Sequence, residues 1–404
     1  MRKILICVFL FCLLQLSCLR EKLAPESEQS FNKYYGLNLS NEGIDAKQLG
    51  DGGFIVLGST TNGSGIKSMC LVKTDIFGNP EWAKQIDGVK NEIGIGIQVL
   101  PDGNFIVVAN LFSGDSVKIS LRKISNSGNV LWAKQYAILS RQFANNVQLT
   151  SSGGIVIAGR VEKNLATAAL LIFTSIDGDK SDSVVNPQSI FKSTATSKNP
   201  SNYEAKYITE IKSGKFIVVG SSNYKLGSHG LSDVIISTVN TTGNIHKLAT
   251  TKFFGGTKSD SGYCIKAITD STFICLASKS TIDSGANIYL FKFKLNTNDG
   301  FDMIWEKNYD TPNDDKATSM EMISKDEFAI TGTTMQKNGN SSTMFLKVDG
   351  NGNEITSKTY GFSGKRSGKK LVKTIDNGFV IVGSNENSTF SMINLMKIMN
   401  NGDF

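Results

Sequence analysis

Residues 51–59 read DGGFIVLGS, and this pattern decides the fold because it returns six more times along the chain. Each copy places a turn sequence before a large apolar residue and a run of apolar, often β-branched residues. The other copies are DGNFIVVAN from Asp102, SGGIVIAGR from Ser152, SGKFIVVGS from Ser213, DSTFICLAS from Asp270, KDEFAITGT from Lys325 and DNGFVIVGS from Asp376. Gly, Asp and Ser favour turns, whereas β-branched residues favour strands. The sequence therefore predicts a repeated all-β unit.

The first large apolar residue of each copy is an anchor for the repeat, and successive anchors lie 50 to 61 residues apart. The anchors are Phe54, Phe105, Ile155, Phe216, Phe273, Phe328 and Phe379. Gly or Ala stands four residues after each anchor, at Gly58, Ala109, Gly159, Gly220, Ala277, Gly332 and Gly383. Gly or Ala also stands eleven residues before each anchor, at Gly43, Gly94, Ala144, Ala205, Gly262, Ala317 and Gly368. Small residues recur where backbones approach closely, as on the crowded inner strands of a radial array.

Each unit contains four short stretches with β character. In the second unit they are residues 95–100, 105–110, 118–124 and 130–136, separated by polar or turn-forming segments. Four strands in roughly 40–50 residues are typical of a propeller blade, and no long segment has helical periodicity. The sequence predicts an all-β, seven-bladed β-propeller of four-stranded antiparallel blades.

The two ends of the chain complement each other. The last unit ends at residues 397–404, after its third strand, so its fourth strand is missing. Residues 31–35, FNKYY, repeat the pattern of the fourth strand of the first unit, WAKQI at residues 82–86, with Phe in place of Trp. We expect the N-terminal strand to complete the last blade and remove an open sheet edge.

Residues 1–17, MRKILICVFLFCLLQLS, place two charges before a short apolar run, which is typical of an export signal and too short to span a bilayer. A small residue, Ser17, directly precedes Cys18. This ending resembles a bacterial lipoprotein signal, although Gln15 stands where that family usually has Leu. The resemblance implies acylation of Cys18, with chains such as palmitate, and plain secretion is the alternative. We expect a signal peptide at 1–17, a tether at 18–30 and the propeller at 31–404, anchored in the bacterial cell envelope at the outer membrane.

The propeller body resembles repeat propellers of bacterial lipoproteins and secreted proteins. Their blades carry the DGG-aromatic motif followed by Lys-x-Asp-x-x-Gly-Asn-x-x-Trp, here Lys73 to Trp82. The block from Asp75 to Trp82 is also similar to the tryptophan-docking motif of pyrroloquinoline-quinone dehydrogenases and of a non-catalytic propeller of outer-membrane protein assembly. These resemblances imply the fold and export, but no activity, because function resides in individual sites.

Composition excludes several classes of function. The formal charge is +7 without a concentrated basic stripe, so we expect no nucleic-acid partner. Two histidines and no close Cys/His cluster make a zinc site improbable. The propeller body contains three cysteines, Cys70, Cys264 and Cys275. We expect them to be free thiols buried in the core, and a disulfide between Cys264 and Cys275 is the alternative. We expect no catalytic residue, cofactor or resident metal, although a cation at the Asp349–Glu354 turn or the Asp310, Asp314, Asp315 loop is an alternative.

The connections between second and third strands and between consecutive units should share one face of the ring. These loops are the longer ones, at 60–67, 138–142, 221–231, 254–261, 279–286, 309–315 and 333–341. Variable loops on a rigid scaffold are common binding sites, so this rim is the predicted binding face. A long polar insertion at 177–202 is a second candidate for partner docking. Seven residues before each anchor, polar side chains are expected to line the central channel, at Lys47, Gln98, Gln148, Thr209, Lys266 and Glu321, with Val372 as the apolar exception.

The sequence therefore favours a monomeric, lipid-anchored, non-enzymatic protein that binds a protein or glycan partner of the envelope through this rim. A scaffold for outer-membrane protein assembly is one alternative. An enzyme with its site on the rim, a quinoprotein dehydrogenase or a polysaccharide hydrolase or lyase, is another. An enzyme predicts converging carboxylates or a Tyr/Arg/Lys set, whereas a binder predicts a flatter rim with exposed aromatic residues.

Overall fold

The computed structural model describes residues 30–86, 91–138, 141–163, 166–185, 202–223, 231–242, 245–280, 285–297, 300–309, 313–361, 363–387 and 389–404. In these ranges the chain forms strands and turns without a helix. The predicted signal peptide and tether, residues 1–29, lie outside the described residues. Within the described part no helix is long and apolar enough to cross a bilayer.

Hydrogen-bonded pairing divides the described strands into seven antiparallel groups of four. The first three groups are β2 (Ser40–Gln48), β3 (Phe54–Thr61), β4 (Lys67–Thr74) and β5 (Pro80–Ile86); β6 (Asn91–Val99), β7 (Phe105–Ser113), β8 (Ser116–Ile124) and β9 (Val130–Tyr136); and β10 (Arg141–Leu149), β11 (Ile155–Lys163), β12 (Ala166–Thr174) and β13 (Lys180–Val185). The next two are β14 (Tyr203–Lys212), β15 (Lys215–Ser222), β16 (Asp233–Thr242) and β17 (Ile245–Phe254); and β18 (Asp260–Ala267), β19 (Thr272–Ser280), β20 (Ala286–Leu295) and β21 (Phe301–Tyr309). The last two are β22 (Asp314–Ser324), β23 (Glu327–Met335), β24 (Ser341–Asp349) and β25 (Glu354–Tyr360); and β26 (Lys365–Lys373), β27 (Phe379–Glu386), β28 (Ser391–Ile398) and β1 (Phe31–Tyr35).

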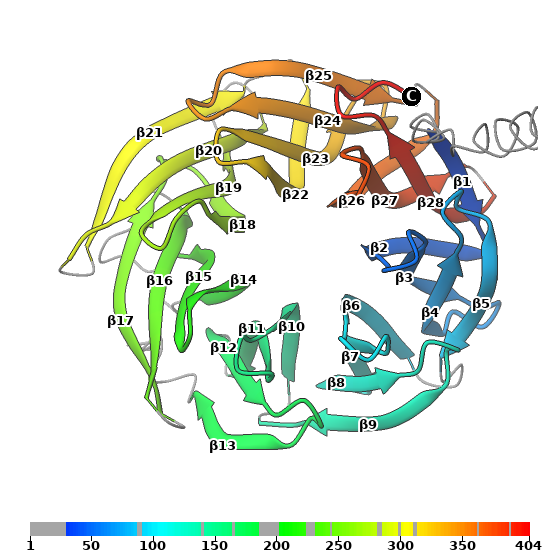
Figure 1. Cartoon of the computed structure of the whole chain (residues 1–404), viewed down its shortest axis with the longest axis horizontal. Coiled ribbons are helices and arrows are strands. Elements are labelled where there is room, and N and C mark those ends of the chain that lie inside the picture. Colours follow the sequence, from blue (N-terminus) through cyan, green and yellow to red (C-terminus); the bar gives the residue numbers. More distant parts are fainter. Residues whose placement is uncertain are drawn as a thin grey trace, which may run out of the picture.

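These groups are the blades of a β-propeller, as predicted. The first strand of each blade lies innermost, and it contacts the first strands of both neighbouring blades around a complete ring (Figure 1). The predicted strands of the second unit match β6 to β9, although β6 begins at Asn91, four residues before the apolar pattern does. The first two extra residues are polar, yet Asn91 and Glu92 pair with Phe112 and Leu111 of β7.

The N-terminal strand closes the ring. β1 pairs antiparallel with β28, with Phe31 opposite Lys397 and Tyr35 opposite Ile393. Phe31 and Tyr35 are both buried and belong to the core cluster that also contains Phe54 and Leu395. The predicted exchange of the outer strand is therefore confirmed, and it joins residues more than 350 positions apart.

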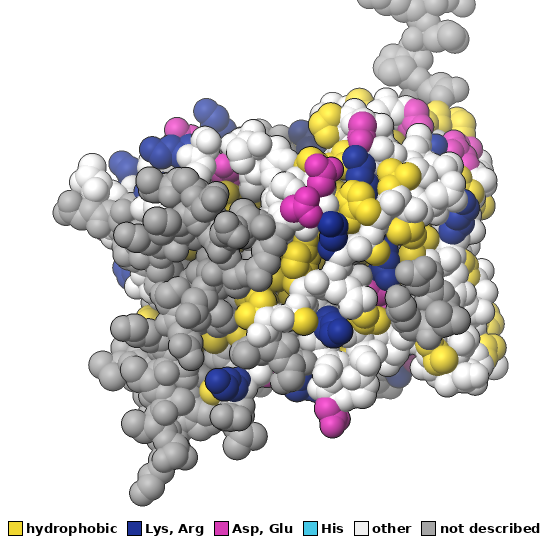
Figure 2. Space-filling view, turned by 90° about the horizontal axis from the view of Figure 1, so that it is seen from below, with side chains coloured by type: hydrophobic (Ala, Val, Ile, Leu, Met, Phe, Trp, Pro, Cys, Tyr) yellow, Lys and Arg dark blue, Asp and Glu magenta, His cyan; other side chains and the backbone are white. Residues whose placement is uncertain are grey.

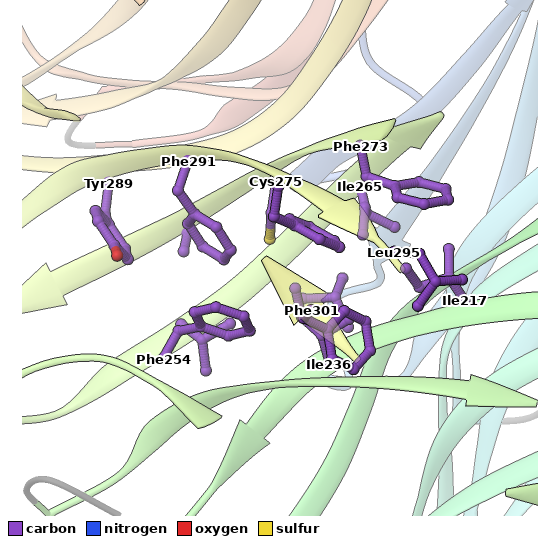
Figure 3. Packing of buried hydrophobic residues seen from close by; sticks show 14 residues of the cluster. Ile217, Ile236, Phe254, Ile265, Phe273, Cys275, Tyr289, Phe291, Leu295 and Phe301 are labelled. Atoms are coloured by element: carbon purple, nitrogen blue, oxygen red, sulfur yellow. The ribbon is translucent and has the colours of Figure 1, made fainter. Parts of the chain in front are cut away.

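The apolar core lies between blades rather than within them. The cluster between the fourth and fifth blades is aromatic (Figure 3). Phe254 of β17 approaches Phe291 of β20 with ring centroids 4.9 Å apart, and Phe273 stacks on Phe293 at 5.4 Å. Both faces of each twisted blade are therefore covered, which explains the nearly continuous burial of second strands such as β3.

A recurring joint links five of the outer strands, β1, β5, β9, β21 and β25, to the next blade. Trp82 of β5 packs against Gly128 in the turn between β8 and β9, where a Cβ would lie 3.0 Å from the indole, and Gly128 has a φ of +79°. The equivalent aromatic–glycine contacts join Phe31 to Gly78, Trp132 to Gly178 and Trp305 to Gly352. A hydroxyl adds to the joint where the strand ends in Tyr: Tyr35, Tyr136, Tyr309 and Tyr360 donate to the carbonyls of Gly78, Gly178, Gly352 and Gly402, at 2.6–2.7 Å. The block resembling a tryptophan-docking motif is thus an inter-blade joint.

The two columns of small residues are cross-strand neighbours. Gly43 pairs with Gly58, Gly94 with Ala109, Ala144 with Gly159, Ala205 with Gly220, Gly262 with Ala277, Ala317 with Gly332 and Gly368 with Gly383. Each of these pairs contains at least one glycine. A β-bulge follows the first member of every pair and brings the two backbones close together. At Gly159, a Cβ would lie only 1.9 Å from the carbonyl oxygen of Phe143.

Candidate functional site

The long connections lie on one face of the ring, as the strand order predicted. Short parallel contacts join the start of an inner strand to the start of the third strand of the preceding blade, for example Ser40 to Ser391, Arg141 to Val117 and Lys365 to Ser341. We call this face the loop rim. The opposite face, the turn rim, carries the tight hydrogen-bonded turns such as Leu49–Gly53 and Asp75–Asn79.

A pocket of about 750 Å³ opens on the loop rim between the third and fourth blades. Its lining comes from strand ends and connections of both blades: Arg141, Arg160, Glu162, Lys163, Ala166, Thr167, Asn202, Tyr203, Glu204, Ser221, Ser222, Asn223, Leu231 and Ser232. Pockets of this volume hold small ligands or a few residues of a polymer.

An ion-pair network forms one wall of this pocket. The Arg160 guanidinium donates to Glu204 of the fourth blade at 2.7 Å and to Glu162 of its own blade at 3.1 Å. Arg141 donates to the other oxygen of Glu162 at 2.8 Å. Both guanidinium groups lie over the Phe143 ring, at 5.4 Å for Arg141 and 4.2 Å for Arg160. The network fixes both arginines in place and joins the two blades.

The charges of the arginines keep Glu162 ionised. Burial opposes its negative charge, but the hydrogen bonds and charges of Arg141 and Arg160 outweigh burial and hold the pKa of the carboxyl below its ordinary value. A carboxylate held in this way is a poor general acid near neutral pH.

Cations remain accessible at the mouth of the pocket. The Arg141 side chain is 44% exposed, and Lys163 is exposed with no ion pair to any residue that the structure describes. Amides and hydroxyls supply most of the remaining lining, together with the apolar side chains of Ala166 and Leu231. The side-chain oxygen of Asn202 accepts from Thr167 Oγ1 at 2.7 Å, and the backbone N–H of Asn202 donates to Asn223 at 2.6 Å. Such a surface suits a hydroxyl-rich ligand that carries negative charge.

The sequence predicted the face on which the long connections lie, but it did not predict this pocket. The pocket residues come from two blades, and Arg141 lies in β10 rather than in the predicted loop at 138–142. One signal was available. Five residues after the anchor, Arg160 is the only charged residue in a column that otherwise holds Ser59, Asn110, Ser221, Ser278, Thr333 and Ser384.

Within the described ranges, the other candidate residues do not gather into a metal-cation site. Asp349 caps its own turn, accepting from the backbone N–H groups of Asn351 and Asn353 at 2.8 Å. Asp315 is buried while Asp314 is exposed, and Asp310 lies outside the described residues. The structure gathers no group of three metal-ligating side chains in its described ranges. Cys264 and Cys275 are buried free thiols, as is Cys70, so the two do not pair. Cys18 lies outside the described residues.

The predicted channel residues do converge. Lys266 pairs with Glu321 at 2.9 Å, and Gln98 donates to the carbonyl of Val147 in the neighbouring inner strand at 2.7 Å. Val372, the apolar member, packs against a core cluster instead. On the outside of the ring, charged side chains of both signs are scattered over the described surface (Figure 2).

No family model and no curated protein matches this sequence. Solved structures do match its fold. One similar structure is the polysaccharide lyase Uly1, with a TM-score of 0.51 and 11% sequence identity over 94% of both chains. Another is the WD40 domain of Toxoplasma gondii coronin, with a TM-score of 0.50 and 10% sequence identity over 94% of this chain and 90% of the coronin chain. A prolyl oligopeptidase B from Galerina marginata has a TM-score of 0.48 and 10% identity, with 93% of this chain matching 49% of that one. Identities this low show the fold alone: the chain is a β-propeller.

Proposed function

We propose that this protein is a non-enzymatic, monomeric binding propeller that holds an acidic glycan in the loop-rim pocket between its third and fourth blades. The observation that carries the proposal is the network of Arg141, Arg160, Glu162 and Glu204 in a pocket whose other lining residues include the amides and hydroxyls of both blades. Sugar hydroxyls match the amide and hydroxyl lining, and a sugar carboxylate matches the exposed ends of Arg141 and Lys163. An acidic protein segment is the second type of partner that this surface suits.

Two features favour binding over catalysis. Glu162 is in ion pairs with both arginines, which makes it a poor proton donor, and the Glu204 carboxylate is paired with Arg160. Tyr203 is the hydroxyl that would complete a Tyr/Arg/Lys set, but its side chain is almost fully buried at 5% exposed.

The proposal includes export and a lipid anchor at Cys18, and the fold gives that anchor a direction. β1 begins at the turn rim, where Phe31 contacts Phe54 and the Gly78 turn. The 12 residues from 19 to 30 can reach at most about 40 Å when fully extended. A tether to Cys18 would therefore leave the propeller at the turn rim, the face opposite the pocket.

Replacing the proposed lipid site, Cys18→Ala, should abolish fatty-acid labelling and release the protein from the membrane fraction, because acyl chains on Cys18 would provide the attachment. Metabolic labelling with a palmitate analogue and fractionation of the cells measure both effects. Cys12→Ala is the matched control, since Cys12 lies inside the predicted signal and should leave both unchanged. Continued labelling of the Cys18→Ala protein would contradict the anchor.

Removing the exposed cations of the pocket, Arg141→Ala with Lys163→Ala, should weaken binding of polygalacturonate oligosaccharides at least about 10-fold, because two charge-assisted contacts to carboxylates are lost. Calorimetric titration at fixed ionic strength measures this. The matched control is Lys294→Ala with Lys325→Ala, which removes the same charge from two exposed lysines at the turn rim. Equal weakening in both double variants would show a nonspecific charge effect and contradict the site.

Partner capture distinguishes the remaining alternatives. If crosslinking of the membrane-anchored protein recovers an envelope protein through pocket residues, the scaffold for outer-membrane protein assembly replaces the glycan proposal. If the protein shortens polygalacturonate, as judged by size-exclusion chromatography, the pocket belongs to an enzyme.

A further inference from the structure

A second pocket, of about 330 Å³, opens between the fifth and sixth blades, and we call it the seam pocket. Three buried apolar side chains line it, Ile288 of β20 and Met344 and Leu346 of β24. The innermost strand of the sixth blade, β22, contributes the buried carboxylate of Asp315, and the outer strand β25 contributes Thr359. This volume lies at the lower end of the range of about 300–1,000 Å³ that is usual for ligand sites.

The sixth blade has a short side chain at the outer wall of the seam pocket. Thr359 lies opposite Met344 of β24, and the equivalent pair in the seventh blade is Tyr34 opposite Asn394. The residues equivalent to Thr359 in the first, second and fifth blades are Gln85, Gln135 and Asn308. Tyr, Gln and Asn all extend further from the backbone than Thr, so the outer wall of the sixth blade leaves more space.

In the next seam, between the sixth and seventh blades, an arginine of the chain itself lies at the equivalent place. Arg366 has the position in β26 that Asp315 has in β22, since each stands thirteen residues before its anchor. Its guanidinium Nη1 donates to the hydroxyl of Tyr34, the equivalent of Thr359, at 3.3 Å. A Cβ on Gly361 of the sixth blade would clash with the Arg366 side chain, which therefore lies in the seam.

The second blade shows how a carboxylate at the position of Asp315 is matched. Glu92 is the equivalent residue, and its carboxylate pairs with the Arg122 guanidinium at 2.6 Å, with both side chains at most 2% exposed. Arg122 lies in β8 opposite Ala133, the place that Leu346 takes in β24 opposite Ser357. The sixth blade therefore keeps the carboxylate but has leucine in place of the arginine, and the seam pocket lies beside that leucine.

The charges of the seam pocket favour a cation. Glu354 of β25 adds a second, exposed carboxylate to the lining. Lys358 is the one cation among the described lining residues, and its ammonium pairs with Asp403 of the seventh blade at 3.1 Å. Buried carboxylates are stabilised by positively charged partners, and a guanidinium matches a carboxylate in shape as well as in charge.

We propose that the seam pocket binds the side chain of an arginine from a partner protein, with the guanidinium beside Asp315 and the aliphatic stem against Met344 and Leu346. The seams before the second and seventh blades contain an arginine of the chain itself, whereas here the arginine comes from outside. This site is independent of the pocket between the third and fourth blades and of the anchor, so each proposal can fail without the others.

The experiment uses N-acetyl-arginine amide as the probe and N-acetyl-citrulline amide, which has a similar shape without the charge, as its control. Calorimetric titration of the protein at fixed ionic strength should show saturable binding of the arginine compound. The citrulline compound should bind at least about 10-fold more weakly, because the charge-assisted contact to a carboxylate is lost. Crystals soaked in the arginine compound should show its guanidinium within hydrogen-bond distance of Asp315. Equal binding of the two compounds, or a soaked crystal with an empty seam pocket, would overturn the proposal.

Thr359→Tyr copies the seventh blade and should abolish binding, because the larger side chain fills the seam pocket. Thr356→Tyr is the matched control: it makes the same change on the other face of β25, where Trp82 and Trp305 stand in the first and fifth blades. Asp315→Asn keeps the shape of its side chain and should weaken binding at least about 10-fold, which tests the site even if Thr359→Tyr does not fold. Full binding by either pocket variant would contradict the assignment.

Discussion

A chain that begins at Gly36, and so lacks β1, is expected to lose at least about 5 kcal/mol of folding free energy and to aggregate. Phe31 and Tyr35 are 9% and 7% exposed, and truncating one large buried aromatic side chain typically costs about 3–5 kcal/mol. The deletion also removes the backbone pairing of five residues with β28 and uncovers that strand as a free edge. The loss is comparable to the whole stability of many domains.

Urea unfolding followed by circular dichroism, together with light scattering, measures this effect. A chain that begins at Ser30 is the matched control, because it keeps β1 and removes only residues outside the described fold. Phe31→Ala in that control background is a milder version, which should cost about 3 kcal/mol while leaving the backbone pairing in place. If the chain from Gly36 unfolds at the same urea concentration as the chain from Ser30, closure through β1 contributes nothing to stability.

Gly159→Ala is expected to destabilise the protein by about 3 kcal/mol, far more than an ordinary methyl addition on a strand. The new Cβ would lie 1.9 Å from the Phe143 carbonyl oxygen, and its cross-strand partner is already Ala144. In the second blade the same pair is reversed, with Gly94 opposite Ala109. Either position of the cross-strand pair can therefore hold an alanine methyl group, but in no blade do both positions hold one.

The double variant Ala144→Gly with Gly159→Ala tests this explanation, because it gives the third blade the arrangement of the second. It should recover at least half of the stability that Gly159→Ala loses. Gly63→Ala is the control: its Cβ would meet nothing within 4 Å, so its stability should change by less than about 0.5 kcal/mol. A double variant as unstable as the single one would show that the clash is not set by the pair.

The predictions that held depended on features that every unit repeats. Anchors such as Phe54 and Phe105 are fully buried because each starts a second strand covered by neighbouring blades. Closure was predictable because residues 31–35 repeat the pattern of β5 and β9. The same residues explain the aromatic–glycine joints, although the partner glycine lies in the next unit, where no single repeat could indicate it.

The sequence did not predict the role of a column of polar residues, because their side-chain type changes from unit to unit. Thirteen residues before their anchors, Asn41, Gln142 and Asp260 are buried and accept from backbone N–H groups four residues earlier, in the connection between blades. Glu92 occupies the same position and pairs with the buried Arg122 at 2.6 Å. These side chains differ in type, so the column resembles a variable surface in the sequence, yet Asn41, Gln142 and Asp260 share one structural role in the loop rim.

The sequence by itself determined the all-β class, the repeated four-stranded unit, the completion of the last blade by the first strand and the face on which the loops lie. All of these follow from local turn chemistry and from the repetition of apolar positions, which each unit carries within itself. Only the tertiary structure decided which residues of different blades meet: the pocket network of Arg141, Arg160 and Glu204, and the pair of Lys266 with Glu321 in the central channel. Those contacts depend on ring closure, which brings together side chains that no spacing along the chain relates.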